Sequence, residues 1–170
     1  MEQFAEGFTS KACYGILDLF VAFDQQALDK SSQDFTTFQT PLGAKQLTCI
    51  PMGYTNAVQI MHGDVTFILQ PEIPHVTELY IDDVGVKGST TRYELTGGGY
   101  ETIPENPGIR RFVWEHLNNF NRVLQQMKKV GGTFSRKKLT VCAPSANVVG
   151  HKCCYKGRVL DESRIQKIRD

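Results

Sequence analysis

The stretch Thr77–Gly88, TELYIDDVGVKG, constrains the fold of this chain more than any other. Apolar, aromatic and β-branched residues lie on both sides of the adjacent acids Asp82 and Asp83, which predicts a β-hairpin with the acids at its tip. Neighbouring carboxylates repel each other, so they need a proton or a cation between them, and Mg²⁺ suits such oxygen ligands. The alternative is an ordinary Asp-Asp turn, because aspartate is common in turns.

The composition excludes several classes of protein. The chain has 170 residues, of which 41% are hydrophobic and 22% charged, and this indicates one globular domain. No run approaches the roughly 20 apolar residues of a membrane span, and the start, MEQFAEGFTSK, lacks the pattern of a secretory signal. We therefore expect an intracellular location, in a cytoplasmic particle or the nucleus, and not secretion.

The five cysteines are odd in number and form no CxxC pair, so we expect reduced thiols. A zinc site can be drawn from Cys142, His151, Cys153 and Cys154, but the adjacent cysteines have the wrong spacing for one.

The net charge of +1 hides a strong asymmetry between the two parts of the chain. Residues 1–109 carry 5 basic and 14 acidic residues, whereas residues 110–170 carry 14 basic and 4 acidic ones. An acidic part beside a basic part suits a protein that holds a metal with one and a polyanion with the other. Ordinary solvated helix faces are the alternative.

The pattern before the acidic hairpin predicts a strand, a short helix, a hairpin and a longer helix. A buried strand over 12–19 brings Asp18 to an edge, and residues 20–31 have helical spacing. Segments 35–40 and 46–50 flank a Pro-Leu-Gly turn, which is typical of a hairpin. A helix from Asn56 to about Leu69 has an apolar face of Val58, Met61, Val65 and Ile68.

After the hairpin, residues 89–108 predict a surface loop or small hairpin. Residues 110–130 form the clearest helix, ended by Gly131-Gly132, with an apolar stripe of Phe112, Val113, Leu117, Phe120, Val123, Leu124 and Met127. A basic cluster and a strand follow in 133–142, then a hairpin in 147–159, and Asp161 caps a final basic helix. The order predicts an α+β fold, an antiparallel sheet with helices packed on one face.

Five motifs in this order, and a sixth segment after them, resemble a reverse transcriptase palm and the start of its thumb, specifically that of a gypsy-type LTR retrotransposon, and closest to fungal forms. LDLFVAFDQ resembles the first acidic motif, IPMGYTNAVQIMHGDV the proline-glycine motif and its helix, and YIDD the signature turn. GGTFSRKKL resembles the next motif, VVGHKC the primer grip, and DESRIQKI the first thumb helix. The resemblance implies a palm with partial fingers over residues 1–160 and the start of the thumb in 161–170.

The resemblance also implies an RNA-directed DNA polymerase, which adds a dNTP to a primer 3′-hydroxyl by a two-metal mechanism. Asp18 and Asp82 would hold two Mg²⁺ ions, with Mn²⁺ as an alternative, and Asp83 would support them. Template-primer contacts would come from Tyr80, Gly150 and His151. Other partners would be further parts of a retrotransposon polyprotein.

The residues that the resemblance assigns to the nucleotide are Leu19, Phe23, Met52, Gly53 and Lys138. Phe23 would stack under the sugar and exclude a ribose; from the residues alone, a core aromatic is the better reading. Met52 stands where many relatives have glutamine and cannot donate that hydrogen bond.

The basic finger segment that clamps the triphosphate in this family has no counterpart upstream of Asp18. We therefore expect a fragment with little activity alone, with fingers and thumb mostly missing. A catalytically dead retroelement remnant that binds nucleic acid or a protein partner is the alternative.

Overall fold

The fold is built around strand β1 (Tyr14–Asp18), which lies between β5 (Asp83–Lys87) and β8 (Thr140–Ala143). A computed structural model describes residues 2–160 and places β4 (Thr77–Tyr80) beyond β5, so the sheet order is β4-β5-β1-β8. All three pairings are antiparallel. The expected α+β class with an antiparallel sheet is confirmed.

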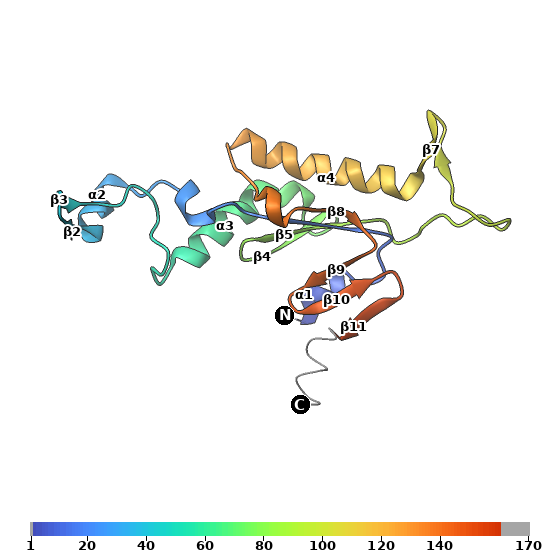
Figure 1. Ribbon diagram of the computed structural model, residues 1–170, viewed down its shortest axis with the longest axis horizontal. Coiled ribbons are helices and arrows are strands. Elements are labelled where there is room, and N and C mark those ends of the chain that lie inside the picture. The colour runs from blue at the N-terminus through green and yellow to red at the C-terminus, as the bar shows by residue number, and fades with distance from the viewer. Residues whose placement is uncertain (1, 161–170) are drawn as a thin grey trace.

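Two long helices, α3 (Ala57–Leu69) and α4 (Arg111–Lys129), cover one face of this sheet (Figure 1). Side chains alternate between the faces of a strand, so every second residue of β1 and β5 points toward the helices. The resulting core contains Leu17, Leu19, Val84 and Val86 from the sheet segments, Met61, Val65 and Leu69 from α3, and Phe120, Val123 and Met127 from α4. The apolar residues that recur along the two helices therefore pack into one shared core.

The buried faces of both helices differ from the expected ones at three positions. Val58, Leu117 and Leu124 are 42%, 39% and 37% exposed, because each lies at the rim of the helix face that meets the sheet. Helix α4 instead buries His116 completely. Its predicted end is confirmed: Gly131 has φ 74° and the amide of Gly132 donates to Met127 O at 2.9 Å, which caps the last turn.

The opposite face of the sheet is covered by α1 (Glu2–Gly7) and by a second sheet, in the order β11-β10-β9 (Figure 1). Its strands are β9 (Ser145–Val148), β10 (His151–Cys154) and β11 (Gly157–Leu160), one strand more than the hairpin expected there. Phe8, just after α1, packs so closely on β5 that a Cβ on Gly85 would lie 2.2 Å from its Cζ. The sequence analysis did not foresee α1, since six residues carry little periodicity.

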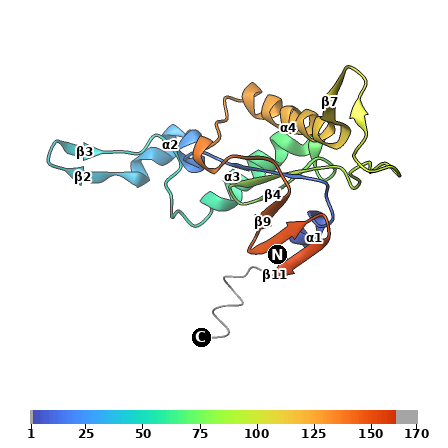
Figure 2. The ribbon, with the colours of Figure 1, turned by 45° about the vertical axis from the view of Figure 1, so that its right-hand side comes forward.

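Two hairpins extend from the body of the molecule. The first pairs β2 (Phe38–Thr40) with β3 (Gly43–Lys45) and forms an arm that Figure 2 shows pointing away from the sheet. This confirms the hairpin but places its second strand at Gly43–Lys45, not at 46–50, because a two-residue turn closes it. The second pairs β6 (Thr102–Ile103) with β7 (Asn106–Arg110) at the start of α4.

Short helices make up most of the remaining regular structure. Residues 20–31 do not form one helix: the structure has a 3₁₀ turn η1 (Ala22–Gln25) and then α2 (Lys30–Gln33), whose N-cap Asp29 accepts from the Ser31 amide. The other 3₁₀ turns are η2 (Asp34–Thr36), η3 (Gln70–Glu72) and η4 (Arg136–Lys138).

All five cysteines are free thiols. Within residues 2–160, no helix is both long enough and apolar enough to cross a membrane. The helix expected after Asp161 lies outside the described residues, as does the start of the thumb expected in 161–170.

Candidate acidic site at the end of the sheet

Two of the three predicted acids face each other across neighbouring strands. Asp18 is the last residue of β1 and Asp83 the first of β5, and the register pairs them directly. Directly opposite residues point to the same face of a sheet, so both carboxylates lie on the face opposite α3 and α4. Asp18 is only 6% exposed, whereas Asp83 is open to solvent. The pair thus has one buried and one solvated acid.

The third acid lies in the turn that joins β4 to β5. Tyr80 pairs with Asp83, which leaves Ile81 and Asp82 as a two-residue turn. Ile81 has φ 57°, which is unusual for a β-branched residue and indicates local backbone strain. The amide of Leu19 donates to the backbone carbonyl of Asp82 at 3.1 Å. The turn is therefore fastened to the segment that follows Asp18.

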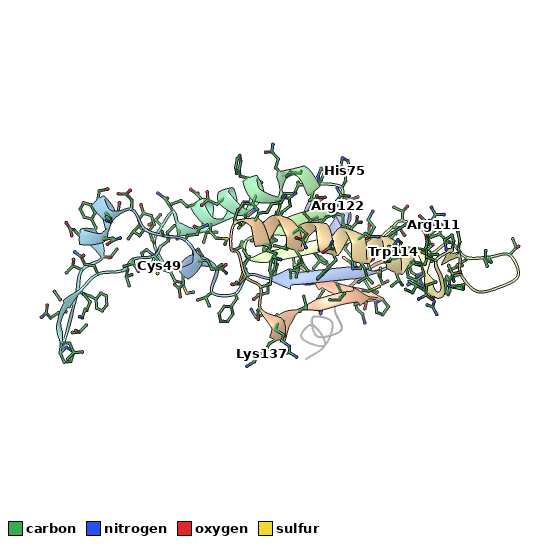
Figure 3. All side chains as sticks on the ribbon, turned by 90° about the horizontal axis from the view of Figure 1, so that it is seen from above. Cys49, His75, Arg111, Trp114, Arg122 and Lys137 are labelled. Carbon is green, nitrogen blue, oxygen red and sulfur yellow. The ribbon has the colours of Figure 1, made fainter. Side chains whose placement is uncertain are left out.

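The chain after α4 brings a cation to the same place. The amide of Ser135 donates to Asp18 O at 2.8 Å, and the amide of Phe20 donates to Thr133 O at 3.1 Å, so this segment runs beside the end of β1. Turn η4 follows at once, and Lys138 Nζ lies 2.6 Å from Asp18 Oδ2. Its neighbour Lys137 projects away from the body (Figure 3).

The charges of these side chains affect one another. Partial desolvation of its carboxylate by neighbouring atoms, and then the negative charges of Asp82 and Asp18, raise the pKa of Asp83, while Lys138 opposes this shift. The hydrogen bond and charge of Asp18 raise the pKa of Lys138, with smaller contributions from Asp82 and Asp83. One lysine therefore offsets part of the charge of three carboxylates.

The acidic side chains of this site have the right chemistry to bind a divalent cation, although they do not form a complete set of ligands. Among residues 2–160, no three His, Cys, Asp or Glu side chains converge as the ligands of a metal ion would. Magnesium, however, is usually bound by one or two carboxylates together with water and substrate phosphates, and Asp18 and Asp83 already face each other. Desolvation is the main cause of the raised pKa of Asp83, and the charges of Asp82 and Asp18 add to it; a cation would relieve this added repulsion. The zinc site from Cys142, His151, Cys153 and Cys154 does not form.

The predicted nucleotide residues are not all brought to the acids. Leu19 follows Asp18 directly but its side chain is buried in the core, and Phe23 in η1 packs against the same core. Met52 is 78% exposed, ahead of α3. Gly53 has φ 93°, so the local backbone requires glycine, and no atom lies within 4 Å of where its Cβ would be. Of the five, Lys138 alone contacts the carboxylate of an acid, whereas Leu19 reaches Asp82 only through its backbone amide.

The predicted template-primer residues come from the end of β4 and from the second sheet. Tyr80, at the end of β4, packs against Phe4 of α1 with ring centroids 5.7 Å apart. Gly150 has φ 75° in the turn before β10, and His151 is the first residue of that strand. The sequence analysis missed Phe4, since an isolated phenylalanine near a terminus gives no periodic signal.

The sequence analysis also missed Ser135, which contacts Asp18 only through its backbone amide. The GGTFSRKKL motif placed Lys138 but gave no sign of this contact.

Solved structures with a similar fold include viral protease-reverse transcriptases. The chain aligns over 99% of its length with the foamy viral protease-reverse transcriptase in complex with double-stranded DNA, with a TM-score of 0.78 and 21% identity. It aligns over 98% with the foamy viral enzyme in complex with an RNA/DNA hybrid, with a TM-score of 0.73 and 22% identity. These alignments cover 26% and 20% of the viral chains. The protein therefore has a reverse transcriptase-like fold.

A curated relative comes from a transposable element. The chain is 24% identical over 157 residues to the retrovirus-related Pol polyprotein from transposon 412 of Drosophila melanogaster. The match covers 92% of this chain and 11% of that polyprotein, so the chain spans about a tenth of its relative. No family model matches.

Proposed function

We propose that this chain is the palm of an RNA-directed DNA polymerase from a gypsy-type LTR retrotransposon similar to fungal forms. Its reaction would be the attack of a primer 3′-hydroxyl on the α-phosphate of a dNTP, with release of pyrophosphate. The observation that supports this is the placement of Asp18, Asp82 and Asp83 at one end of an antiparallel sheet, on a reverse transcriptase-like fold.

In this proposal Asp18, Asp82 and Asp83 hold two Mg²⁺ ions, which Mn²⁺ can replace. When bound, such ions lower the pKa of the attacking hydroxyl and neutralise the leaving pyrophosphate. The protein contributes rigid placement, because Asp18 and Asp83 belong to paired strands and the backbone of Asp82 is fastened to Leu19. The exposed position of Asp83 leaves one side open for the substrate phosphates.

Lys138 would change partner during the reaction. Its Nζ is 2.6 Å from Asp18 Oδ2, where it compensates the buried carboxylate, and its side chain is 65% exposed. A flexible lysine of this kind can move to the leaving phosphates once another cation satisfies Asp18, and can donate a proton there. The raised pKa of Lys138 keeps it protonated until that exchange.

The proposed partners are an RNA or DNA template-primer, a dNTP and other parts of a polyprotein. The foamy viral structures that share the fold contain nucleic acid duplexes. Turn η4 exposes Arg136 and Lys137 beside the acidic site, and both can reach phosphates. Binding through such contacts weakens steeply as salt rises.

Primer extension tests this proposal. The chain, alone or joined to flanking segments of its polyprotein, is incubated with an RNA template, a DNA primer, dNTPs and Mg²⁺. Extension is expected with the wild type and with Asp64→Asn, an exposed acid on α3, but not with Asp82→Asn. Extension that survives Asp82→Asn would remove the assigned chemistry.

A nucleic-acid-binding remnant without chemistry is the second candidate. The observation that favours it is the Lys138–Asp18 contact, which already compensates the most buried of the three acids at the site. Salt-sensitive duplex binding together with no extension, even when the flanking segments are present, would support the remnant. Absence of binding at low salt would count against both candidates.

A further inference from the structure

A pair of cysteines lies at the other end of strands β1 and β8, away from the acids. Cys13 directly precedes β1, and Cys142 belongs to β8, the neighbouring strand. Both thiols pack in one small cluster with Ala12 and Phe112, and both line a cavity of about 280 Å³. Because the register pairs Tyr14 with Ala143, Cys13 and Cys142 are diagonal neighbours across β1 and β8. Diagonal neighbours lie about 7–8 Å apart, so a disulfide between them requires a small shift of the backbone.

The local backbone is irregular at this pair. The pairing of β1 with β8 shifts register between Tyr14 and Ile16, and Cys142 has φ 49° at the irregularity. A cysteine in this conformation is uncommon and marks local strain, of the kind that gathers at functional sites.

The two thiols differ in chemistry. Cys13 is 2% exposed, whereas Cys142 is partly open to solvent. A hydrogen bond from Cys13 lowers the pKa of Cys142 to about 7, and the same contact together with burial raises the pKa of Cys13. Cys142 is therefore the more readily ionised of the two thiols, and the thiolate is the nucleophilic form. Cys142 is the attacking thiol and Cys13 the resolving one.

Two guanidinium groups determine what the cavity can bind. Arg92 and Arg110 line it together with the thiols. Each guanidinium stacks on a tyrosine, with Arg92 Cζ 4.4 Å from the ring centroid of Tyr155 and Arg110 Cζ 4.6 Å from that of Tyr100. In the described part of the chain neither arginine forms an ion pair. Stacking uses the flat face of a guanidinium and leaves N–H groups at its edge to bind carboxylates.

We propose that Cys13 and Cys142 form an oxidisable dithiol site that accepts a small disulfide bearing carboxylates, of the class of oxidised glutathione. The Cys142 thiolate attacks one sulfur, the ligand's S–S bond breaks, and one glutathione leaves as its thiolate. The sulfur of Cys13, after losing its proton, then attacks Cys142 Sγ and expels the second glutathione. The dithiol loses two electrons and the ligand gains them.

The product would be a disulfide between β1, which ends at Asp18, and β8, which follows Lys138. The cavity has room for the sulfur end of the ligand and one carboxylate, so the rest of the ligand extends into solvent.

The experiment exposes the reduced, folded full chain to oxidised glutathione at pH 7 and locates the modified cysteines by peptide mass mapping. The wild type is expected to form the Cys13–Cys142 disulfide. Cys13→Ser is expected to accumulate glutathione on Cys142, and Cys142→Ser to form neither product. Cys49→Ser is the matched control, because Cys49, labelled in Figure 3, follows the β2–β3 arm and does not line the cavity.

A second comparison tests the arginines. The cationic disulfide cystamine should react with Cys142 at least several-fold more slowly than oxidised glutathione, and Arg92→Gln with Arg110→Gln should remove that difference. Circular dichroism confirms that each variant is folded, and Cys13→Ala replaces Cys13→Ser if the latter unfolds. The proposed site would be refuted if Cys49 and Cys142 were modified equally, or if Cys142 reacted only in denaturant. The proposed ligand class would be refuted if cystamine and oxidised glutathione reacted with Cys142 at the same rate.

Discussion

Replacing His116 with leucine should stabilise the protein, although it removes a buried residue. His116 is 0% exposed under the sheet, and neither ring nitrogen has a hydrogen-bond partner. It packs against Phe120, and a Cβ on Gly15 would lie 3.2 Å from His116 Nε2, so the site is closely packed. The histidine therefore occupies a core position without satisfying its polar atoms.

The magnitude follows from two opposing effects. An unsatisfied buried polar group costs about 1–3 kcal/mol. A leucine of similar volume fits imperfectly, at a cost below about 1.5 kcal/mol. His116→Leu should therefore raise the free energy of unfolding by about 1 kcal/mol, which shifts a urea midpoint upward by roughly 0.5 M.

The same histidine gives a pH signature. Burial lowers its pKa in the folded state, and a weak contact with the backbone of Lys87 only partly opposes this. The unfolded chain then binds more protons, so the contribution of His116 to stability is full above the unfolded pKa of about 6.5 and is lost as pH falls toward the folded pKa.

The assay is urea unfolding at pH 7.5 and pH 5.5, followed by circular dichroism. The wild type should lose more stability between these pH values than His116→Leu, whereas His75→Gln, at an exposed position, should behave as the wild type. A destabilised His116→Leu with unchanged pH dependence would show that the ring is satisfied and would refute the reasoning.

Three further predictions follow from single contacts. Gly85→Ala should lower the free energy of unfolding in urea by about 1–3 kcal/mol, because the new Cβ would displace Phe8 and α1. Gly63→Ala, at an exposed position of α3, is the control and should raise the free energy of unfolding by about 0.5–1 kcal/mol. Asp83→Asn should raise the melting temperature at pH 7 while abolishing any extension. Because the pKa of Asp83 is raised in the folded state, its contribution to stability is present at acid pH and is lost as pH rises through that pKa. A melting temperature unchanged relative to Asp64→Asn would contradict this. Arg122→Met should cost about 1–3 kcal/mol in thermal unfolding, since Arg122 Nη2 lies 2.7 Å from the buried Glu72 Oε2; no loss would mean that water replaces the arginine.

The fold was largely predictable where the sequence has strong periodicity or strong turn residues. The β4–β5 hairpin, α3, α4 and the glycine end of α4 all lie close to their predicted ranges. The errors fall where tertiary contacts override local pattern. Val58 has the spacing of a core residue, yet α3 turns it outward, and His116 lacks apolar character, yet α4 buries it.

For the site, the sequence predicted a set of three acids but not how they are arranged. It placed Asp18 and the Asp82-Asp83 turn on separate strands, which the register confirms. The direct pairing of Asp18 with Asp83, and the contact of Lys138 with Asp18, depend on the segment 133–135 running beside β1. Such a long-range backbone contact leaves no residue pattern. The roles of all the predicted site residues stay predictions.

The left-handed backbone of Ile81 limits how the acidic turn can change. A β-branched residue held at φ 57° costs about 1–3 kcal/mol and persists only where its surroundings fix it. Here the Tyr80–Asp83 pair on one side and the Leu19 amide on the other do so. Glycine at this position would release the strain, and it would also let Asp82 sample many directions. At this residue, a more stable turn would therefore hold the Asp82 carboxylate in a less defined direction.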